Sequence, residues 1–303
     1  MTPDALKGAR EFVSWGELDE ALTILTSEWD PADALASEAA DLKAGILFAK
    51  GDTAGALEPL AELVVAGNAN FHTHYRLAEY HRALGNIDQT ILNHRLAHAQ
   101  FGWTESVRHG YSFTHDYFSP NIPAWESWFK NVVTAAPIEA LEIGSWQGGS
   151  ASWLLDKVIS RRGGRLTCID TFEGSSEHAH FIGGLGSSIE TMFDNNIIRT
   201  GHGDKLRKLV GYSQVVLPTL WGEKFDFIFI DGAHEAQFVI QDAVLCWGLI
   251  QPGGFILFDD ANFTFAQRPM QNTIRALEFF LSVFGDDLKI IDQGAQLLIQ
   301  RTR

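Results

Sequence analysis

The chain has 303 residues, 46% hydrophobic and 20% charged, which is typical of a folded protein with a large apolar core and excludes disordered and collagen-like classes. Its formal net charge of −15 argues against nucleic acid as a partner, because binding phosphates requires a surface rich in Lys and Arg. The N-terminal residues lack the pattern of a signal peptide and no stretch approaches the roughly 18 apolar residues of a membrane span, so we expect a cytoplasmic protein without a membrane partner.

Residues 1–108 are rich in Ala, Leu and Glu in helical rhythm and contain no convincing strand. Three similar segments begin at Gly16, Gly51 and Gly85, at intervals of 35 and 34 residues. Five positions after each glycine stands a small residue, namely Ala21, Ala56 and Thr90. Such an interval is typical of paired helices that need glycine at the turn and a small side chain at the crossing. The region resembles tetratricopeptide repeats, and the alternative is an irregular helical bundle.

Residues 109–303 alternate short β-rich segments with helical ones. The predicted strands are residues 138–144, 165–170, 206–211, 225–231, 254–260, 288–292 and 295–301. The predicted helices are residues 150–159, 189–198, 213–220, 236–249 and 269–284. This alternation predicts right-handed crossovers and hence a Rossmann-like α/β fold with a mostly parallel, seven-stranded sheet. Only Gln293 and Gly294 separate the last two strands, so these must form an antiparallel hairpin.

A glycine-rich turn follows the first predicted strand, in the segment EALEIGSWQGGSASWLLD at residues 139–156. Parallel α/β sheets bind ligands at the carboxyl ends of their strands, so this turn is a candidate nucleotide-binding loop. Its order, ExGxxxGGS from Glu142 to Ser150, differs from the GxGxxG of dinucleotide-binding enzymes because Trp146 replaces the second glycine. A carboxylate there would repel a phosphate but favour the sulfonium and amino groups of S-adenosylmethionine. A nicotinamide-linked oxidoreductase is therefore disfavoured.

With this loop, residues 111–303 resemble class I S-adenosylmethionine-dependent methyltransferases. Three segments carry the resemblance, namely LEIGSWQGGSA, TCIDTFEG at the end of the second predicted strand, and VGYSQVVLP after the third. The similar group includes catechol O-methyltransferase and the metal-dependent sugar and macrolide O-methyltransferases. The resemblance implies a methyl donor bound along one edge of the sheet.

The resemblance also implies a role for each motif residue. Gly144 and Ser145 would approach the methionine part of the cofactor, Ser150 would bind its carboxylate, and Asp170 would bind both ribose hydroxyls, as is usual for adenosine cofactors. The predicted cofactor-binding residues are Glu142, Gly144, Ser145, Gly148, Ser150, Asp170, Ser213 and Gln214. In the alternative interpretation Glu142 supports only a turn, and Asp170 and Ser213 are helix caps.

Three aspartates end the fourth and fifth predicted strands, Asp231 on one and Asp259 and Asp260 on the other. Neighbouring parallel strands end at one edge, so these carboxylates should converge, which is costly unless a cation compensates them. Oxygen ligands suit a hard cation, most plausibly Mg²⁺. The resemblance implies the same, because metal-dependent members of the family hold their ion at these positions. Alternatively, Asp231 serves the fold and the other two cap the strand end.

His234 follows Asp231 by three residues, where catechol O-methyltransferase has its catalytic lysine. An imidazole suits a general base near neutral pH, although His234 could instead be a further metal ligand or a structural residue. A divalent ion would lower the pKa of an acceptor hydroxyl and orient it for in-line displacement. We therefore expect His234 and Asp231 to be catalytic. The glycine-rich residues 171–188 predict a mobile flap over the site.

These observations favour a magnesium-dependent O-methyltransferase that acts on a hydroxyl of a small molecule, such as a sugar-bearing natural product or a saccharide. A protein methyltransferase or a scaffold is the alternative, in which residues 1–108 recruit a partner protein. Repeat domains also mediate self-association, so residues 1–108 are the candidate surface for either kind of contact.

Overall fold

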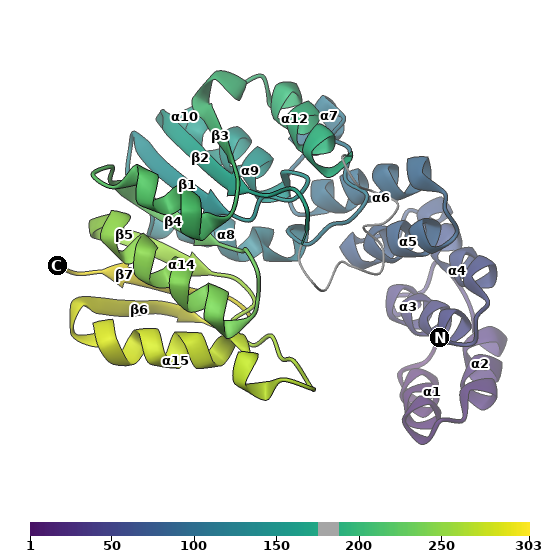
Figure 1. Cartoon of the computed structure of the whole chain (residues 1–303). Helices are drawn as coiled ribbons and strands as arrows, with labels where there is room; N and C mark the ends of the chain where they lie inside the picture. The colour runs from purple at the N-terminus through teal and green to yellow at the C-terminus, as the bar shows by residue number, and fades with distance from the viewer. Residues whose placement is uncertain (175–187) are drawn as a thin grey trace. The chain divides into compact units, whose positions relative to one another are not determined.

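The computed structural model describes residues 1–174 and 188–303 (Figure 1). The chain divides into two compact units, Met1–Pro120 and Asn121–Arg303. Most of the predicted flap at residues 171–188, including His178 and His180, lies outside the described residues. Within the described part of the chain, no helix is both long and apolar enough to cross a membrane.

The first unit is helical, as predicted. Its helices are α1 (Pro3–Trp15), α2 (Leu18–Ser27), α3 (Ala36–Ala49), α4 (Thr53–Val65), α5 (Phe71–Ala83), α6 (Ile87–Gln100) and α7 (Glu105–His109). Gly16, Gly51 and Gly85 follow the first helix of successive pairs with φ of +81°, +86° and +75°, a conformation that glycine adopts without strain. The small residues that follow, Ala21, Ala56 and Thr90, are fully buried. The geometry agrees with paired helices, and membership of the tetratricopeptide family stays a prediction.

A buried polar cluster joins α6 and α7 to the segment that ends this unit. His98 Nδ1 lies 2.7 Å from Ser106 Oγ, and His98 Nε2 lies 3.1 Å from Asp116 Oδ2. Burial opposes ionisation of Asp116, but the neighbouring histidine and the hydroxyl of Ser119 outweigh it and hold the Asp116 pKa below its usual value. Ser106, His98 and Asp116 are linked like a catalytic triad, but all three side chains are almost completely buried. We therefore interpret them as a structural hydrogen-bond network in which the serine is not accessible to a substrate.

The second unit is built on one sheet of seven strands in the order β3-β2-β1-β4-β5-β7-β6. The strands are β1 (Ile138–Ile143), β2 (Gly164–Asp170), β3 (Leu206–Val210), β4 (Phe225–Ile230), β5 (Ile250–Phe258), β6 (Leu288–Gln293) and β7 (Leu297–Arg301). The first five are parallel to one another, whereas β7 runs antiparallel to both β5 and β6. The predicted Rossmann-like sheet with a terminal hairpin is therefore confirmed.

Most helices of this unit lie in the predicted intervals, but α8 (Ile122–Asn131), before the first strand, was not predicted. The others are α9 (Gly149–Leu154), α10 (Ser160–Arg162), α12 (Ser188–Thr200), α13 (Ser213–Val216), α14 (Ala236–Leu249) and α15 (Thr273–Phe284). A π-helical turn, Leu155–Ile159, joins α9 to α10 where the sequence predicts one continuous helix. Short 3₁₀ turns occur at Leu217–Leu220, after α13, and at Pro269–Gln271, before α15, because each contains a proline that cannot donate a backbone hydrogen bond.

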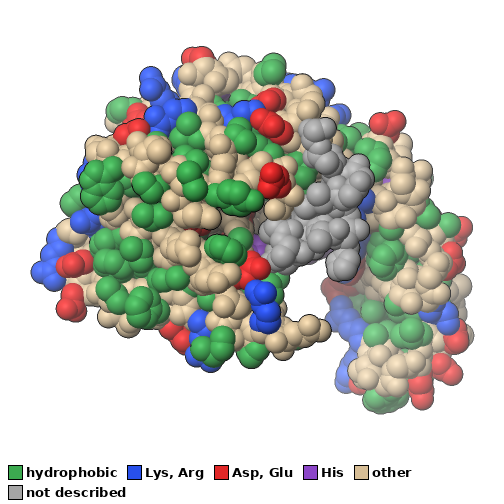
Figure 2. Space-filling model, in the orientation of Figure 1, with side chains coloured by type: hydrophobic (Ala, Val, Ile, Leu, Met, Phe, Trp, Pro, Cys, Tyr) green, Lys and Arg blue, Asp and Glu red, His purple; other side chains and the backbone are tan. Residues whose placement is uncertain are grey.

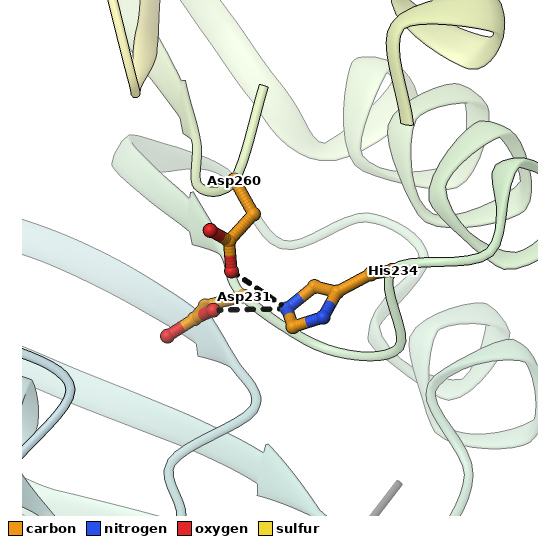
Figure 3. A group of neighbouring side chains, drawn as sticks. All are labelled: Asp231, His234 and Asp260. Carbon is orange, nitrogen blue, oxygen red and sulfur yellow. Dashed lines mark ion pairs between the residues drawn. The ribbon is translucent and has the colours of Figure 1, made fainter. Parts of the chain in front are cut away.

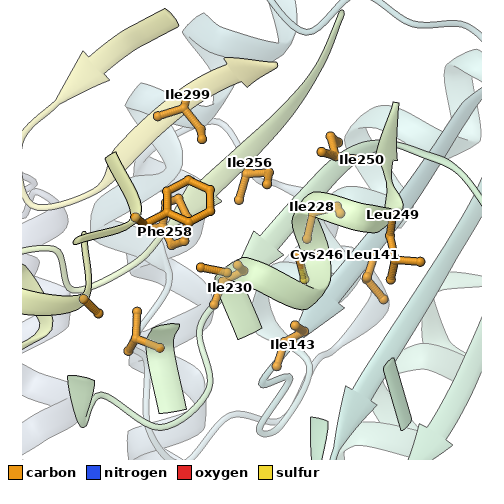
Figure 4. Close-up of a cluster of buried hydrophobic side chains, with 14 of the residues drawn as sticks. Leu141, Ile143, Ile228, Ile230, Cys246, Leu249, Ile250, Ile256, Phe258 and Ile299 are labelled. Atoms are coloured by element: carbon orange, nitrogen blue, oxygen red, sulfur yellow. The ribbon is translucent and has the colours of Figure 1, made fainter. Parts of the chain in front are cut away.

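Both faces of the sheet are covered, with α14 and α15 in front and α8 behind in Figure 1. The front layer buries an apolar cluster, shown in Figure 4, that includes Leu141, Ile143, Ile228, Ile230, Cys246, Leu249, Ile250, Ile256, Phe258 and Ile299. On the other face the fully buried Trp125 packs edge-on against Phe229, with ring centroids 4.8 Å apart, and donates from Nε1 to Gln296 Oε1 at 3.0 Å. Because the strand interiors are apolar on both faces, polar side chains that could bind a ligand gather at the strand ends.

Candidate functional site

The buried carboxylate of Glu142 stabilises the turn after β1 through hydrogen bonds. Its oxygens accept hydrogen bonds from Ser145 Oγ at 2.6 Å, from Ser150 Oγ at 2.5 Å and from Cys168 Sγ at 3.2 Å. Burial raises the pKa of Glu142, the three donors lower it, and the charge of Asp170 raises it further. Ser150, predicted to bind the cofactor, here donates to Glu142, so the glutamate fixes both serines of the loop.

The same turn is tied to the end of β2. Asp170 Oδ2 accepts the backbone N–H groups of Ser145 and Trp146, at 2.6 and 2.8 Å. Gly144 and Gly148 have φ of +83° and +84°, which allows the chain to turn back toward the sheet within five residues. The carboxyl ends of β1 and β2 are thereby joined by hydrogen bonds of the loop itself.

Ser213 and Gln214 begin α13, after β3, and both side chains reach the surface or its edge. Below them lies Asp242, a buried aspartate of α14 that the sequence analysis did not single out. Burial raises the pKa of Asp242 to about 6, and the Ser213 hydroxyl partly offsets this effect. A Cβ atom on Gly232 would lie 3.5 Å from Asp242 Oδ2, so this carboxyl group packs directly against the loop that follows β4. One charged residue within an otherwise apolar helix is the signal that could have revealed it.

Three side chains converge at the ends of β4 and β5, as Figure 3 shows. His234 Nε2 lies 3.0 Å from Asp260 Oδ2 and 3.9 Å from Asp231 Oδ1. The three potential ligand atoms lie within 4.8 Å of one another, a spacing that could hold one metal ion. The side chains of Asp231, His234 and Asp260 remain 29%, 16% and 45% exposed, so a small ligand can reach the group.

Asp259 does not belong to this group, although the sequence analysis predicts it as a ligand. Its Oδ1 accepts the backbone N–H of Asp260 at 2.8 Å. Asp260 has a φ of +47°, an unusual conformation for a residue other than glycine, which the hydrogen bond from its N–H supports. Asp260 therefore faces His234, while Asp259 holds the turn and still lies close enough to Asp231 to raise its pKa.

Comparison with known families assigns the central part of the second unit. Residues 141–261 match the family model of a methyltransferase domain. This match begins within β1 and covers β2 to β5, the glycine turn and the three converging side chains. The match agrees with the prediction of a methyltransferase domain in this unit.

The curated relatives agree. The chain is 32% identical over 120 residues to a putative O-methyltransferase of Mycobacterium sp. (strain JLS), covering 39% of this chain and 46% of that protein. It is 28% identical over 123 residues to the O-methyltransferase hkm8 of Aspergillus hancockii, covering 37% and 48% of the two chains. The chain spans about half the length of the curated relatives it matches. Among solved structures, an O-methyltransferase from Bacillus cereus in complex with SAH is 18% identical, covers 68% of this chain and 90% of that one, and has a TM-score of 0.47.

The electrostatics of the methyltransferase domain are those of a crowded acidic site. Burial raises the pKa of Asp231 well above its usual value, the nearby Asp259 raises it further, and His234 opposes both effects. For Asp259, burial and then the charge of Asp260 raise the pKa to about 6. Repulsion between close carboxylates favours binding of either protons or a cation, and both would relieve it.

The histidine is held from two sides by the segment between β5 and α15. The ring of Phe263 packs at an angle against the His234 ring, with centroids 4.8 Å apart. Thr273 Oγ1 donates to the backbone carbonyl of His234 at 2.9 Å. This segment begins directly after Asp260, so one stretch of chain supplies both a carboxylate of the group and the support for its imidazole.

Proposed function

We propose that this chain is an S-adenosylmethionine-dependent, magnesium-dependent O-methyltransferase that acts on a hydroxyl of a small molecule, such as a saccharide or a sugar-bearing natural product. The main support is the arrangement of one strand edge: a glycine turn fixed by Glu142 and Asp170, and beside it two carboxylates and an imidazole within 4.8 Å. Both the glycine turn and the group of Asp231, His234 and Asp260 belong to residues 141–261, which match a methyltransferase domain.

In this proposal the cofactor lies over the turn from Gly144 to Ser150, with Asp170 binding the ribose and Ser213 and Gln214 beside the adenine. S-adenosylmethionine, when bound, supplies an electrophilic methyl group. The fit is supported by the positive φ of Gly144, which lets the turn pack directly against the backbone of Asp231, and by the acidic residue at the end of β2. Glu142 acts on the ligand through the two serines that it holds.

The metal site consists of Asp231 and Asp260, with His234 as a third group. The carboxylates fit a hard divalent ion such as Mg²⁺, which keeps several waters and would lower the pKa of an acceptor hydroxyl. We assign the proton-accepting role to His234, whose Nε2 lies 3.0 Å from Asp260 Oδ2 and 3.9 Å from Asp231 Oδ1. In this role the nitrogen keeps its lone pair for the proton and does not coordinate the ion. Asp259, which holds the backbone N–H of Asp260 and lies close enough to Asp231 to raise its pKa, stays a candidate third carboxylate of this site.

Calorimetry tests the cofactor assignment. The protein should bind S-adenosylhomocysteine, and Asp170→Ala should weaken this binding by roughly 10- to 100-fold, because charge-assisted hydrogen bonds to the ribose are lost. Asp204→Ala, at an exposed position on the same unit, is the control and should bind like the wild type. If the wild-type protein does not bind S-adenosylhomocysteine, the proposed function is wrong.

Thermal unfolding tests the metal site. The raised pKa values of Asp231 and Asp259 mean that the folded state binds more protons than the unfolded state, so without metal stability should fall as pH rises from about 4 through 6. Saturating Mg²⁺ competes with those protons and should raise Tm by about 5–10 °C at pH 8, but much less at pH 5.

Three variants complete this experiment. Asp231→Asn should lose the Mg²⁺-dependent rise in Tm, whereas Asp204→Asn should keep it. His234→Gln separates the two roles of the imidazole: a general base can be removed without changing the Mg²⁺ effect, whereas removal of a ligand reduces it. An equal rise in Tm for Asp231→Asn and wild type would exclude the proposed site.

A further inference from the structure

A surface pocket of about 440 Å³ is formed by residues that follow His234 and Asp260 along the chain, and none of Asp231, His234 and Asp260 lines it. The pocket is lined by Gln237, Arg268, Pro269, Met270 and Gln271. These residues come from the first turn of α14 and from the segment between β5 and α15. Neither the cofactor loop nor the metal ligands line this pocket.

The walls of the pocket are connected to His234. Gln237 N donates to Gln271 Oε1 at 3.4 Å, which joins the start of α14 to the 3₁₀ turn before α15. Phe263 and Thr273, at the two ends of the same segment, contact the ring and the carbonyl of His234. The residues that support His234 and those that line the pocket therefore belong to the same part of the chain.

Arg268 gives the pocket its charge. Its Nη2 lies 3.5 Å from Glu235 Oε1, and its guanidinium carbon lies 5.7 Å from the centre of the Phe265 ring. These two contacts orient the guanidinium, yet 56% of the side chain stays exposed and the long ion pair uses one of its nitrogens. A guanidinium has five N–H donors, so others can bind a planar or tetrahedral anion in the pocket.

The position of this cation matters because its surroundings are acidic. The carboxylates of Asp231 and Asp260 and the nearby Asp259 would repel an anionic acceptor, and the chain as a whole carries a net charge of −15. Figure 2 shows acidic, histidine and basic side chains next to one another near the middle of the face in view. The positive charge of Arg268 in the pocket would attract an anionic group that the nearby carboxylates repel. The exposed Met270 and Pro269 provide apolar contacts for the carbon skeleton of such a molecule.

We propose that this pocket binds the anionic group, a carboxylate or a phosphate, of a hydroxylated acceptor whose hydroxyl lies at His234. The acceptor is then an acidic small molecule, such as a sugar acid or a sugar phosphate, and Arg268 determines the preference for charge. This inference rests on the proposed function for the position of the hydroxyl, but the binding of the anion can be measured without turnover.

The experiment compares the affinities of glucose, glucuronate and glucose 1-phosphate for the full chain by saturation-transfer NMR, with S-adenosylhomocysteine and Mg²⁺ present. At least one of the two anions should bind roughly three- to tenfold tighter than glucose, as expected for a partly exposed ion pair. The tighter of the two anions identifies the carboxylate or the phosphate as the ligand chemistry. Arg268→Gln should abolish the preference, and Arg268→Lys should keep part of it.

Arg275→Gln is the matched control, because Arg275 is also 56% exposed and pairs with one carboxylate, that of Glu278, at 3.2 Å. It should retain the preference for the anion. Equal affinities for the three sugars in the wild type, no binding of any of them at millimolar concentration, or a preference that survives Arg268→Gln would overturn the proposal. Calorimetry with S-adenosylhomocysteine on the same samples reports separately on the proposed function, since Arg268 variants should bind it like the wild type.

Discussion

Asp231→Asn should lower turnover with S-adenosylmethionine and Mg²⁺ by a hundredfold or more, with the fold preserved. Loss of a residue that only supports a metal ligand typically costs about 10- to 100-fold, and Asp231 is proposed to be a ligand itself. Asparagine has nearly the same shape, and the backbone N–H of residue 231 would still donate to the carbonyl of Ile143, now at 2.8 Å. The substitution therefore removes charge and leaves the link between β1 and β4 unchanged.

Stability should change in the opposite direction from activity. The carboxylate of Asp231 is unfavourable in its charged form, because burial and Asp259 both raise its pKa. Without metal at neutral pH, Asp231→Asn should thus unfold at the same temperature as the wild type or at a higher one. A variant that keeps normal turnover would remove Asp231 from the mechanism, and one that unfolds early would make it structural. Asp204→Asn, far less constrained at the surface, should match the wild type in both measurements.

The architecture of the second unit could be predicted because helical and β-rich segments alternate strictly along the chain. A strand start was harder to locate. The segment IQPGG contains proline and two glycines, which favour a turn, so the fifth strand is predicted to begin at residue 254. In the structure β5 begins at Ile250, paired with Phe225, and a register shift follows before Phe227. Pairing with an already placed strand overcame the local preference.

The candidate site could be predicted only to the level of strand ends. Chain order indicates that Asp231 and Asp260 approach each other, but it cannot decide which of two adjacent aspartates contacts His234. That choice depends on the positive φ of Asp260 and on the hydrogen bond from its N–H to Asp259. Asp242 was missed for a similar reason, because its proximity to Gly232 depends on how α14 packs below the loop.

Gly144→Ala, in the turn proposed to bind the cofactor, should strongly destabilise the fold. A Cβ atom at this position would lie 1.8 Å from the carbonyl oxygen of Asp231 and 2.9 Å from the backbone nitrogen of Gly232. Both atoms belong to the backbone, so no side-chain rotation can relieve the clash and β1 and β4 would have to separate. Overpacking together with a φ of +83° should lower the free energy of unfolding by about 3–5 kcal/mol.

Gly201→Ala separates the clash from the backbone strain. Gly201 has a comparable φ of +72°, yet no atom lies within 4 Å of a Cβ added there, so only about 1–2 kcal/mol should be lost. Urea denaturation of both variants gives the difference, and equal losses would show that the approach of Gly144 to Asp231 does not constrain the fold. Because this approach joins the cofactor turn to the residue proposed to bind metal, Gly144→Ala should also weaken both S-adenosylhomocysteine binding and the Mg²⁺-dependent rise in Tm, whereas Gly201→Ala should affect neither.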